Sequence, residues 1–318
     1  MHLDIIFSQI LGLSILVMVG IIGSKTGILS ENAKDFLAKI IFNITLPLLL
    51  LCNFSKLNIT PKLLSNSLNV IVLTFIVLFF MFLVSWLTIR LIRMSENEAA
   101  VFNTHSMFGN LVYLGFPVIS ALYGYEGLLY AGMFQLVSNL LLWTAGVLIL
   151  SQKKNLNIGQ RMKHIFNTNT IAILIGFTMF LFSVKIPSVL LKSLSGLGDS
   201  TTYLSMLYIG TMMYHSNLKG LMNNKEVYLL AVNKLIIVPV LIIMIFSVLY
   251  LFFQVRFDIL VISVIVILAS MPAMANVVVM AKIFNSDDKL ATANVIVTSV
   301  FSLITLPLVI LLLNFLLA

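Results

Sequence analysis

Charged side chains are scarce in this sequence. Only 9% of its 318 residues are Asp, Glu, Lys or Arg, whereas 60% are hydrophobic. A soluble domain has about 25% charged residues, and the mean hydropathy here is +1.11. The composition therefore predicts an integral membrane protein and leaves little room for a separate soluble domain.

The net charge of +8 is not gathered in one patch. The basic residues are scattered through short loops without a basic stripe or interleaved aromatic residues, so we expect no nucleic-acid partner. Positive loops on the cytoplasmic side of a membrane explain the sign better. With the N-terminus outside, 13 Lys and Arg residues fall in inside loops and 5 in outside loops. We therefore predict a multi-pass protein of the plasma (inner) membrane with both termini extracytoplasmic.

Motifs for catalysis, metal binding and ATP binding are lacking. Cys52 is the only cysteine, which excludes an internal disulfide and a cysteine-based metal cluster. The sequence has no His-Glu-x-x-His, no Gly-x-Ser-x-Gly and no P-loop. We expect no enzymatic activity, no metal and no cofactor, and any transport would be driven by a gradient or by the membrane potential.

Long apolar runs dominate the sequence instead. A helix needs roughly 20 apolar residues to cross the hydrocarbon core of a bilayer. On that basis we predict an all-α protein with about ten spans, and we interpret the first as a retained span rather than a removed signal peptide. The spans are 4–23, 35–54, 68–92, 99–120, 127–150, 169–184, 188–213, 226–253, 258–282 and 290–317.

The longest polar stretch divides the predicted spans five and five. An odd number of spans in each half means that the second half enters the membrane in the opposite orientation. We predict a first five-helix repeat at 1–152, a cytoplasmic linker at 153–167 and an inverted five-helix repeat at 168–318.

Helix-breaking residues gather inside two of the spans, at Gly109–Pro117 and at Met271–Asn276. A proline in a helix interior removes one hydrogen bond and clashes with the preceding turn. In lipid, the freed backbone groups have no water to bind, so each break must face protein or a wet cavity. Two interrupted spans in corresponding halves indicate the substrate site of a transporter.

These motifs resemble those of the auxin efflux carrier family, which includes the plant PIN carriers and bacterial permeases for malate and similar acids. The resemblance is carried by Gly109-Asn110, Leu114-Gly115-Phe116-Pro117 and Gly124, by Met271–Asn276 with Ala281-Lys282, and by Lys234–Pro239. It covers nearly the whole chain and is closest to the malate-permease-like members. Tyr203 stands where the family often has a proline, whereas Pro47 is kept in the second span.

The resemblance implies a mechanism as well as a fold. Spans one, two, six and seven would form a scaffold that often forms a homodimer. Spans three to five and eight to ten would form a transport domain, with the substrate where broken spans four and nine cross. An elevator-like movement of that domain would carry the substrate across the membrane.

Asn110 and Asn276 are the first candidates for substrate binding. An amide offers donors and acceptors without a charge, so it can bind a carboxylate and release it again; alternatively, each asparagine only satisfies backbone groups freed by its nearby proline. We expect Pro117 and Pro272 to open the helices, so that half-helix N–H groups and the positive dipole end favour an anion. Gly115 would permit close approach of backbone or ligand.

Gln135 and Asn139 are four residues apart and share one helix face, and Asn294 and Thr298 repeat this spacing in the tenth span. Either pair could line the substrate cavity or join helices by hydrogen bonds. Lys234 either attracts anions or extends its ammonium group to the membrane surface.

Three residues are candidates for proton or ion coupling: Asp199, His105 and Asn43. An ionisable group inside a membrane is a functional candidate by default, but the residues around Asp199 also suit a helix start that this acid would cap. His105 could exchange protons near neutral pH or pack as a neutral side chain.

The function that these features favour is a secondary carrier of small organic anions such as carboxylates, with proton or sodium coupling left open. A sodium-coupled symporter of the bile-acid type is the alternative transporter. A membrane sensor or a channel is a more remote alternative, because two crossing broken helices suit alternating access better than a continuous pore.

Overall fold

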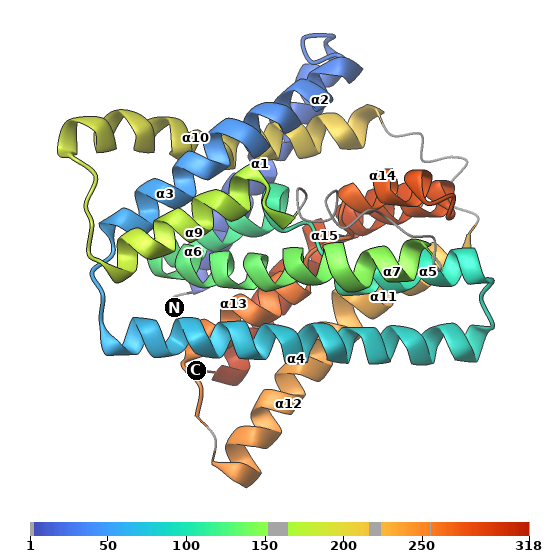
Figure 1. The fold of residues 1–318 in the computed structure, drawn as a ribbon. Coiled ribbons are helices and arrows are strands. Elements are labelled where there is room, and N and C mark those ends of the chain that lie inside the picture. The colour runs from blue at the N-terminus through green and yellow to red at the C-terminus, as the bar shows by residue number, and fades with distance from the viewer. Residues whose placement is uncertain (1–2, 152–164, 216–223, 255, 318) are drawn as a thin grey trace. The chain divides into compact units, whose positions relative to one another are not determined.

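A computed structural model gives the structure of residues 3–151, 165–215, 224–254 and 256–317. Within these ranges no β-strand forms, and the one extended pairing is an isolated antiparallel bridge between Gly109 and Ala273. Most of the predicted linker, residues 152–164, lies outside the described residues. The helices of the first half are α1 (Leu3–Lys25), α2 (Glu31–Ile40), α3 (Leu46–Lys56), α4 (Pro61–Ile92), α5 (Glu96–Met107), α6 (Phe116–Leu141) and α7 (Val147–Ser151) (Figure 1). Those of the second half are α9 (Thr168–Leu181), α10 (Ser188–His215), α11 (Lys225–Val232), α12 (Val238–Phe253), α13 (Ile259–Ala269), α14 (Asn276–Ile283) and α15 (Asp288–Leu317).

The helices confirm a multi-pass membrane protein. Five continuous helical stretches are long and apolar enough to cross a bilayer: Glu31–Lys56, Pro61–Ile92, Leu111–Ser151, Lys225–Phe252 and Asp288–Phe315. Leu11–Lys25, Thr168–Leu181 and Ile259–Ala269 are shorter apolar helices. The longest stretch contains two helical segments that meet at Gly124, whose φ of 57° and ψ of −141° are not helical. The count of ten spans and the inverted repeat stay predictions.

Wide π-helical turns precede three of the prolines. The π segments Ile41–Thr45, Leu111–Gly115 and Asn233–Ile237 each end two residues before a proline: Pro47, Pro117 and Pro239. A proline cannot donate to the preceding turn and its ring displaces the carbonyl there. A π turn absorbs this conflict while the helix continues. These prolines therefore widen their helices without ending them.

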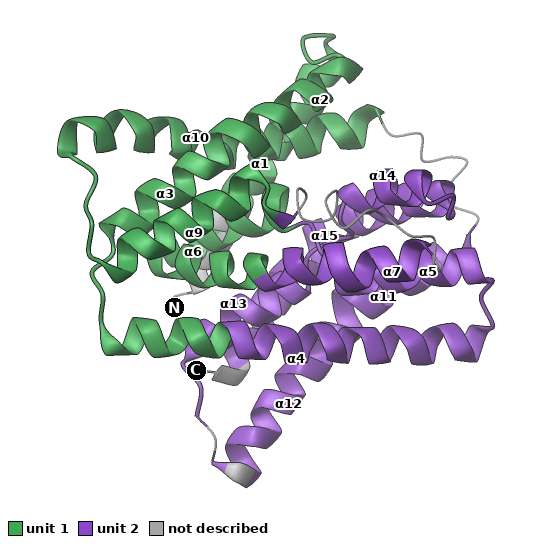
Figure 2. Cartoon of the chain, viewed as in Figure 1, with its two compact units in different colours: residues 1–70, 111–136, 166–216 green, residues 71–110, 137–165, 217–318 purple. Residues whose placement is uncertain are grey.

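The chain forms two compact units, coloured separately in Figure 2. Unit 1 comprises residues 1–70, 111–136 and 166–216. Within it, α1 and α10 approach closely at Gly20, where an added Cβ would lie 2.6 Å from the Leu207 carbonyl oxygen. Small residues permit this close packing of membrane helices. The Phe54 ring of α3 packs on Gly132 and Gly176 in the same way.

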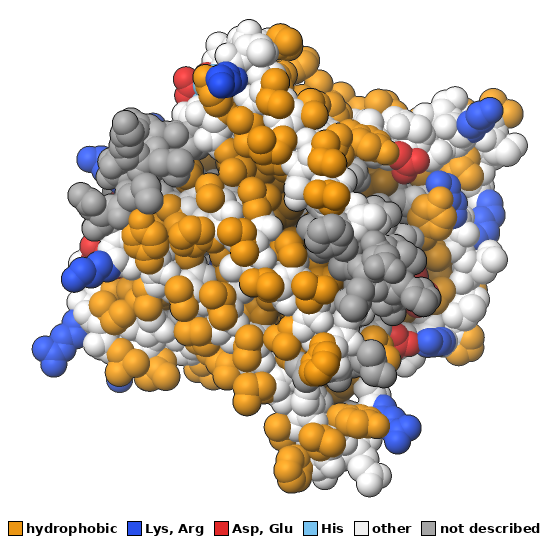
Figure 3. Space-filling model, turned by 180° about the vertical axis from the view of Figure 1, so that it is seen from behind, with side chains coloured by type: hydrophobic (Ala, Val, Ile, Leu, Met, Phe, Trp, Pro, Cys, Tyr) orange, Lys and Arg blue, Asp and Glu red, His pale blue; other side chains and the backbone are white. Residues whose placement is uncertain are grey.

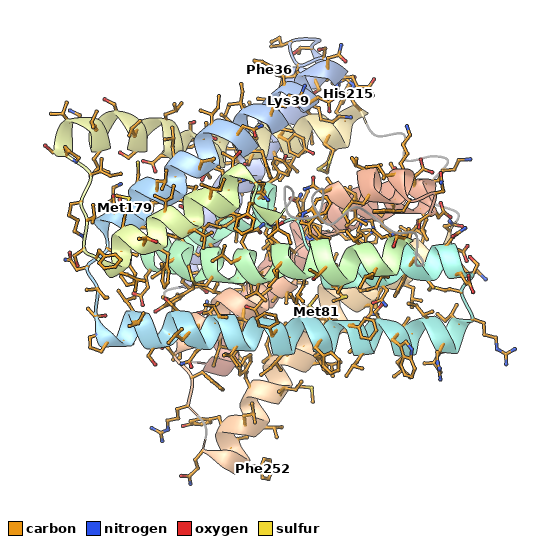
Figure 4. The ribbon with its side chains drawn as sticks, in the orientation of Figure 1. Phe36, Lys39, Met81, Met179, His215 and Phe252 are labelled. Carbon is orange, nitrogen blue, oxygen red and sulfur yellow. The ribbon has the colours of Figure 1, made fainter. Side chains whose placement is uncertain are left out.

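Unit 2 comprises residues 71–110, 137–165 and 217–318. Its centre is α13, in which every residue from Val261 to Ala269 is buried. A helix that is apolar on all sides belongs inside a protein or in lipid, and here neighbouring helices cover it. On α4, Met81 is 1% exposed, whereas Ile76 and Phe79 are exposed (Figure 4).

Exposed apolar side chains are abundant on both units. Ile15 and Ile22 of α1 in unit 1 and Val72 and Phe79 of α4 in unit 2 are examples. Figure 3 shows many hydrophobic side chains at the surface. A monomeric soluble protein rarely exposes such extended apolar surface, and these surfaces suit contact with lipid.

Candidate functional site: two paired helix interruptions

The candidate site lies in unit 2, where two interrupted helices meet. Helix α5 ends at Met107, and Phe108 is extended with φ −106° and ψ 120°. Helix α13 ends at Ala269, and helix α14 begins only at Asn276. The two interruptions pair with each other: Gly109 bridges Ala273, and the Asn110 N–H donates to the Pro272 carbonyl oxygen at 2.7 Å. The prediction that both spans are broken is therefore confirmed.

Gly109 makes this pairing possible. A Cβ at this position would lie 2.9 Å from Met271 Cβ and 3.2 Å from the Met271 carbonyl oxygen. Any other residue would push the two interruptions apart. The value of this glycine is thus close approach of two backbones rather than an unusual dihedral angle.

Helix α15 satisfies part of the freed backbone. The Ala273 N–H donates to Thr298 Oγ1 at 2.9 Å, and that hydroxyl donates to the Asn294 carbonyl oxygen at 2.6 Å. The pair Asn294 and Thr298 therefore joins helices, which is one of the two roles expected from their spacing. Thr298 is fully buried, so this contact replaces water that the bilayer cannot provide.

His105 connects three elements of the site. Its Nε2 lies 3.2 Å from the Met274 carbonyl oxygen, and its Nδ1 lies 3.3 Å from Asn294 Nδ2. The amide nitrogen can only donate, so Nδ1 accepts and Nε2 carries the hydrogen. The ring is fully buried. This arrangement is that of a packed neutral histidine, and a coupling role stays a prediction.

Lys234 is also fully buried, and its Nζ donates to the Ser106 carbonyl oxygen at 2.9 Å. Ser106 lies in the last turn of α5, directly before the interruption. An ammonium group that reached the membrane surface would be exposed, so the surface-reaching interpretation of Lys234 is wrong. A cation at the carboxyl end of a helix is favoured by the helix dipole.

Asn110 and Asn276 occupy different environments. The Asn110 side chain is 3% exposed. Asn276 is half-buried and begins α14, and no hydrogen bond of its side chain forms within the described residues. The residue before it, Ala275, is the N-cap and has no side-chain acceptor for the first N–H groups. The Val277 and Val278 N–H groups donate instead to the carbonyl oxygens of Met274 and Ala275. The start of α14 therefore has no side-chain cap and keeps the positive end of the helix dipole.

Pro117 does not open its helix, contrary to expectation. The interruption lies at Phe108–Asn110, and Pro117 is the second residue of α6 after a π turn. Gly115 and Pro117 are buried in unit 1. Pro272, by contrast, lies inside the second interruption, where it was predicted.

Of the polar pair in α6, the structure shows a contact between segments for Asn139 alone. Asn139 belongs to unit 2, and its Nδ2 donates to the Ile165 carbonyl oxygen at 2.9 Å, so it joins segments of that unit. Gln135 belongs to unit 1 and is 5% exposed, and its Oε1 has no hydrogen-bond partner among the described residues.

The other two coupling candidates lie on the surface of unit 1. Asn43 is exposed, and its Nδ2 donates to the carbonyl oxygen of Lys39 one turn earlier. Asp199 is exposed in the interior of α10, which begins at Ser188, so it caps no helix. The prediction of a helix start at Asp199 is wrong, because α10 runs without a break from Ser188 to His215 and Gly198 packs closely on the Leu49 backbone inside it. Across the described ranges, no group of three or more His, Cys, Asp or Glu residues could hold a metal.

Two features of the site were not predicted from the sequence. Thr298 was noted only for its spacing, and nothing indicated that its hydroxyl would bind the Ala273 N–H. The complete burial of the Lys234 side chain was not predicted either. Its position five residues before Pro239, inside an apolar run, was the available signal, because a lysine in mid-span has to find a polar partner.

Comparison with known proteins agrees with this architecture. A family model described as "membrane transport protein" matches residues 5–310. A protein of Methanocaldococcus jannaschii described as an uncharacterized transporter is 25% identical over 301 residues, which cover 92% of this chain and 94% of that protein. The chain therefore belongs to the membrane transport protein family, that of the auxin efflux carriers, and is a membrane transporter.

Proposed function

We propose that this transporter is a secondary carrier of small organic anions, and that the substrate carboxylate binds at the paired interruptions. The observation that carries the proposal is the start of α14. There a half-buried asparagine side chain, without a hydrogen-bond partner among the described residues, stands at a helix N-terminus that no side chain caps. The next two N–H groups, of Val277 and Val278, donate to the carbonyl oxygens of Met274 and Ala275, so the Asn276 amide is the group left to bind a ligand. Helix N-termini favour anions because their N–H groups and dipole are positive.

An asparagine amide is suited to direct contact with a carboxylate. It can donate two hydrogen bonds to a carboxylate at the point of contact without being ionised itself. Asn110 contributes to the same pairing through its N–H bond to Pro272. Gly115, Pro117, Gln135 and Asn139 stay proposals as substrate-binding residues.

An elevator-type movement is part of the proposal. Both interruptions, their pairing and the contacts from α15 belong to unit 2, so a site built from them can travel as one body. The proposed transport domain comprises spans three to five and eight to ten, and the scaffold spans one, two, six and seven. The compact units divide differently at residues 111–136, which cluster with unit 1. A homodimer through the scaffold, plasma-membrane location and extracytoplasmic termini belong to the same proposal.

The proposal is tested by counterflow in proteoliposomes. Vesicles preloaded with malate, succinate, lactate or indole-3-acetate are diluted into the labelled acid, and saturable accumulation is expected with at least one of them. Asn276→Ala and Asn110→Ala should each reduce accumulation at least about tenfold, because one or two hydrogen bonds to a charged group are lost. Asn97→Ala, an exposed asparagine in the first turn of α5, is the matched control. Unchanged counterflow in both site variants would refute the site.

Sodium coupling is the alternative that the same vesicles address. Asn294 Oδ1 and Asn103 Oδ1 are buried without partners among the described residues, and amide oxygens are suitable ligands for a hard cation. A sodium-coupled symporter requires an inward sodium gradient for accumulation. Equal accumulation with sodium and with potassium would exclude it.

A further inference from the structure

Lys234 is the one buried charge in the described part of unit 2. Its side chain is 0% exposed. Arg90, Arg93, Lys225 and Lys282 of the same unit are all exposed. Among the described residues of the whole chain, no aspartate, glutamate or arginine is buried. A cation held inside a protein is costly unless an opposite charge or several hydrogen bonds compensate it.

No acidic side chain compensates this cation within the described residues. Among the described residues, the only hydrogen bond of Nζ is the one to the Ser106 carbonyl oxygen. On α5, Glu98 and Glu96 lie eight and ten residues before Ser106. They are therefore about 12 and 15 Å away along the helix axis. Glu226 and Asp288 lie near the N-terminal ends of α11 and α15, away from Lys234 in the π segment Asn233–Ile237.

The surroundings of Lys234 are polar but incompletely paired. An ammonium group has three N–H donors, and the Ser106 carbonyl takes one. On the same helix α5, Ser106 Oγ and Asn103 Oδ1 are buried oxygens without a partner among the described residues. Buried polar atoms that lack partners are rare in proteins and call for an explanation.

The location of Lys234 links it to the paired interruptions. Its partner Ser106 follows His105, whose ring holds the Met274 carbonyl oxygen. Four residues after Ser106, the Asn110 N–H binds Pro272. The charge of Lys234 therefore acts on an anion at the interruptions through the protein interior. Screening of charges is weaker there than in water.

We propose that Lys234 is the counter-charge for the transported anion. Its ammonium group acts across the last turn of α5 and selects substrates that carry a carboxylate over neutral molecules of the same shape. This inference rests on the proposed function. It assigns Lys234 the role of a specificity-determining residue that acts by charge, and it predicts that the bound substrate places one negative group at the interruptions.

A purely structural role makes different predictions. Lys234 could serve only as a hydrogen-bonding cap for the carboxyl end of α5. A cap needs an N–H donor, which Lys234→Gln and Lys234→Arg both keep. A counter-charge needs the positive charge, which only Lys234→Arg keeps. The two variants therefore separate the two roles.

The experiment compares acids with their amides as inhibitors of counterflow in proteoliposomes. The probe pairs are lactate with lactamide and indole-3-acetate with indole-3-acetamide. The wild type should bind the better acid at least about tenfold more tightly than its amide, which is the size of effect that a nearby charge produces in a protein interior. Lys234→Gln should lose at least about tenfold in affinity for the acid and change little for the amide, and Lys234→Arg should keep the preference.

Each outcome decides the inference. Equal affinity of the wild type for acid and amide would overturn it without any variant, even if Lys234→Gln did not fold. A folded Lys234→Gln protein with undiminished preference for the acid would overturn it as well. If Asn276→Ala abolishes counterflow while Lys234→Gln does not alter the preference for acids, the proposed substrate site is supported and the counter-charge role of Lys234 is refuted. If no acid drives counterflow, both the proposed function and the role of Lys234 are refuted.

Discussion

The two interruptions reach the same geometry by different chemistry. In the second, Pro272 stands inside the break, which separates α13 from α14. In the first, the break at Phe108–Asn110 holds no proline, and Pro117 follows seven residues after Asn110 in a continuing helix. What opens the first helix is its pairing with the second: Gly109 admits Met271 at a distance that no side chain tolerates. A proline near a break is therefore not always its cause.

Gly109→Val should have the largest effect. The added atoms would overlap Met271, so the bridge to Ala273 and the Asn110 bond to Pro272 could not form. We expect loss of counterflow and destabilisation of about 3 kcal/mol or more, because a well-packed interior must shift to admit the side chain. Counterflow and thermal unfolding of the purified protein measure both effects.

Gly196→Ala is the matched control. An added Cβ there meets nothing within 4 Å, and the residue lies inside α10. Alanine is the better helix former by up to about 1 kcal/mol, so this variant should be as stable as the wild type or more so. Normal counterflow by Gly109→Val would show that the pairing is not needed for transport.

Thr298→Val should have the second largest effect. Valine has nearly the same shape but removes the acceptor of the Ala273 N–H, which then stays buried without a partner. Such a group costs about 1–3 kcal/mol. The second interruption should lose stability, because the Ala273 N–H lies in it. Thermal unfolding measures the change.

Thr305→Val on the same helix is the control for this comparison. The Thr305 hydroxyl donates only to the carbonyl oxygen of Phe301, one turn earlier. Its replacement leaves no buried donor without an acceptor, and stability should change by less than about 0.5 kcal/mol. Equal effects of the two substitutions would mean that the Thr298 bond does not stabilise the interruption.

Pro272→Ala and Pro117→Ala should differ modestly but measurably. In α6, Pro117 does not cause the break, so alanine should change stability by under about 1 kcal/mol and lower counterflow less than alanine at residue 272 does. In the second interruption, alanine at residue 272 lets the chain after Ala269 continue as a helix, which competes with the paired form. Counterflow of Pro272→Ala should therefore be lower. The reverse order would contradict the comparison.

Much of the helical architecture could be predicted from the sequence, because apolar runs in a membrane have few alternatives to helix. The positions of both interruptions were also readable, since glycine, asparagine and proline rarely gather in a span. The break at Met271–Asn276 was placed correctly because a proline acts on its own turn. The break near Gly109 was attributed to the wrong residue, because its cause is a partner 162 residues later in the chain.

Contacts between distant residues explain the remaining errors. Lys234 could be assigned to a span from the sequence. Its burial depends on the Ser106 carbonyl oxygen of α5, which only the tertiary fold brings within hydrogen-bond distance. Asp199 was expected at a helix start because glycines flank it. In the structure, an added Cβ at Gly198 would lie 2.7 Å from the Leu49 backbone nitrogen, so that glycine serves helix packing inside α10. Local propensity cannot distinguish these two uses of glycine.

The central claim is that the substrate anion occupies the start of α14, and protection of a cysteine at that place tests it most directly. Cys52 is the only native cysteine and is 1% exposed, so Cys52→Ala gives a background for Ala275→Cys, which places a thiol at the N-cap of α14 and keeps Asn276. The rate at which a maleimide labels Ala275→Cys is measured with and without a saturating acid that drives counterflow, and Val279→Cys, an exposed position on the same helix, is the control. The account predicts that the acid slows labelling of Ala275→Cys at least about tenfold, as occupancy by a bound ligand requires, and leaves Val279→Cys unchanged. Equal labelling of Ala275→Cys with and without the acid would contradict it.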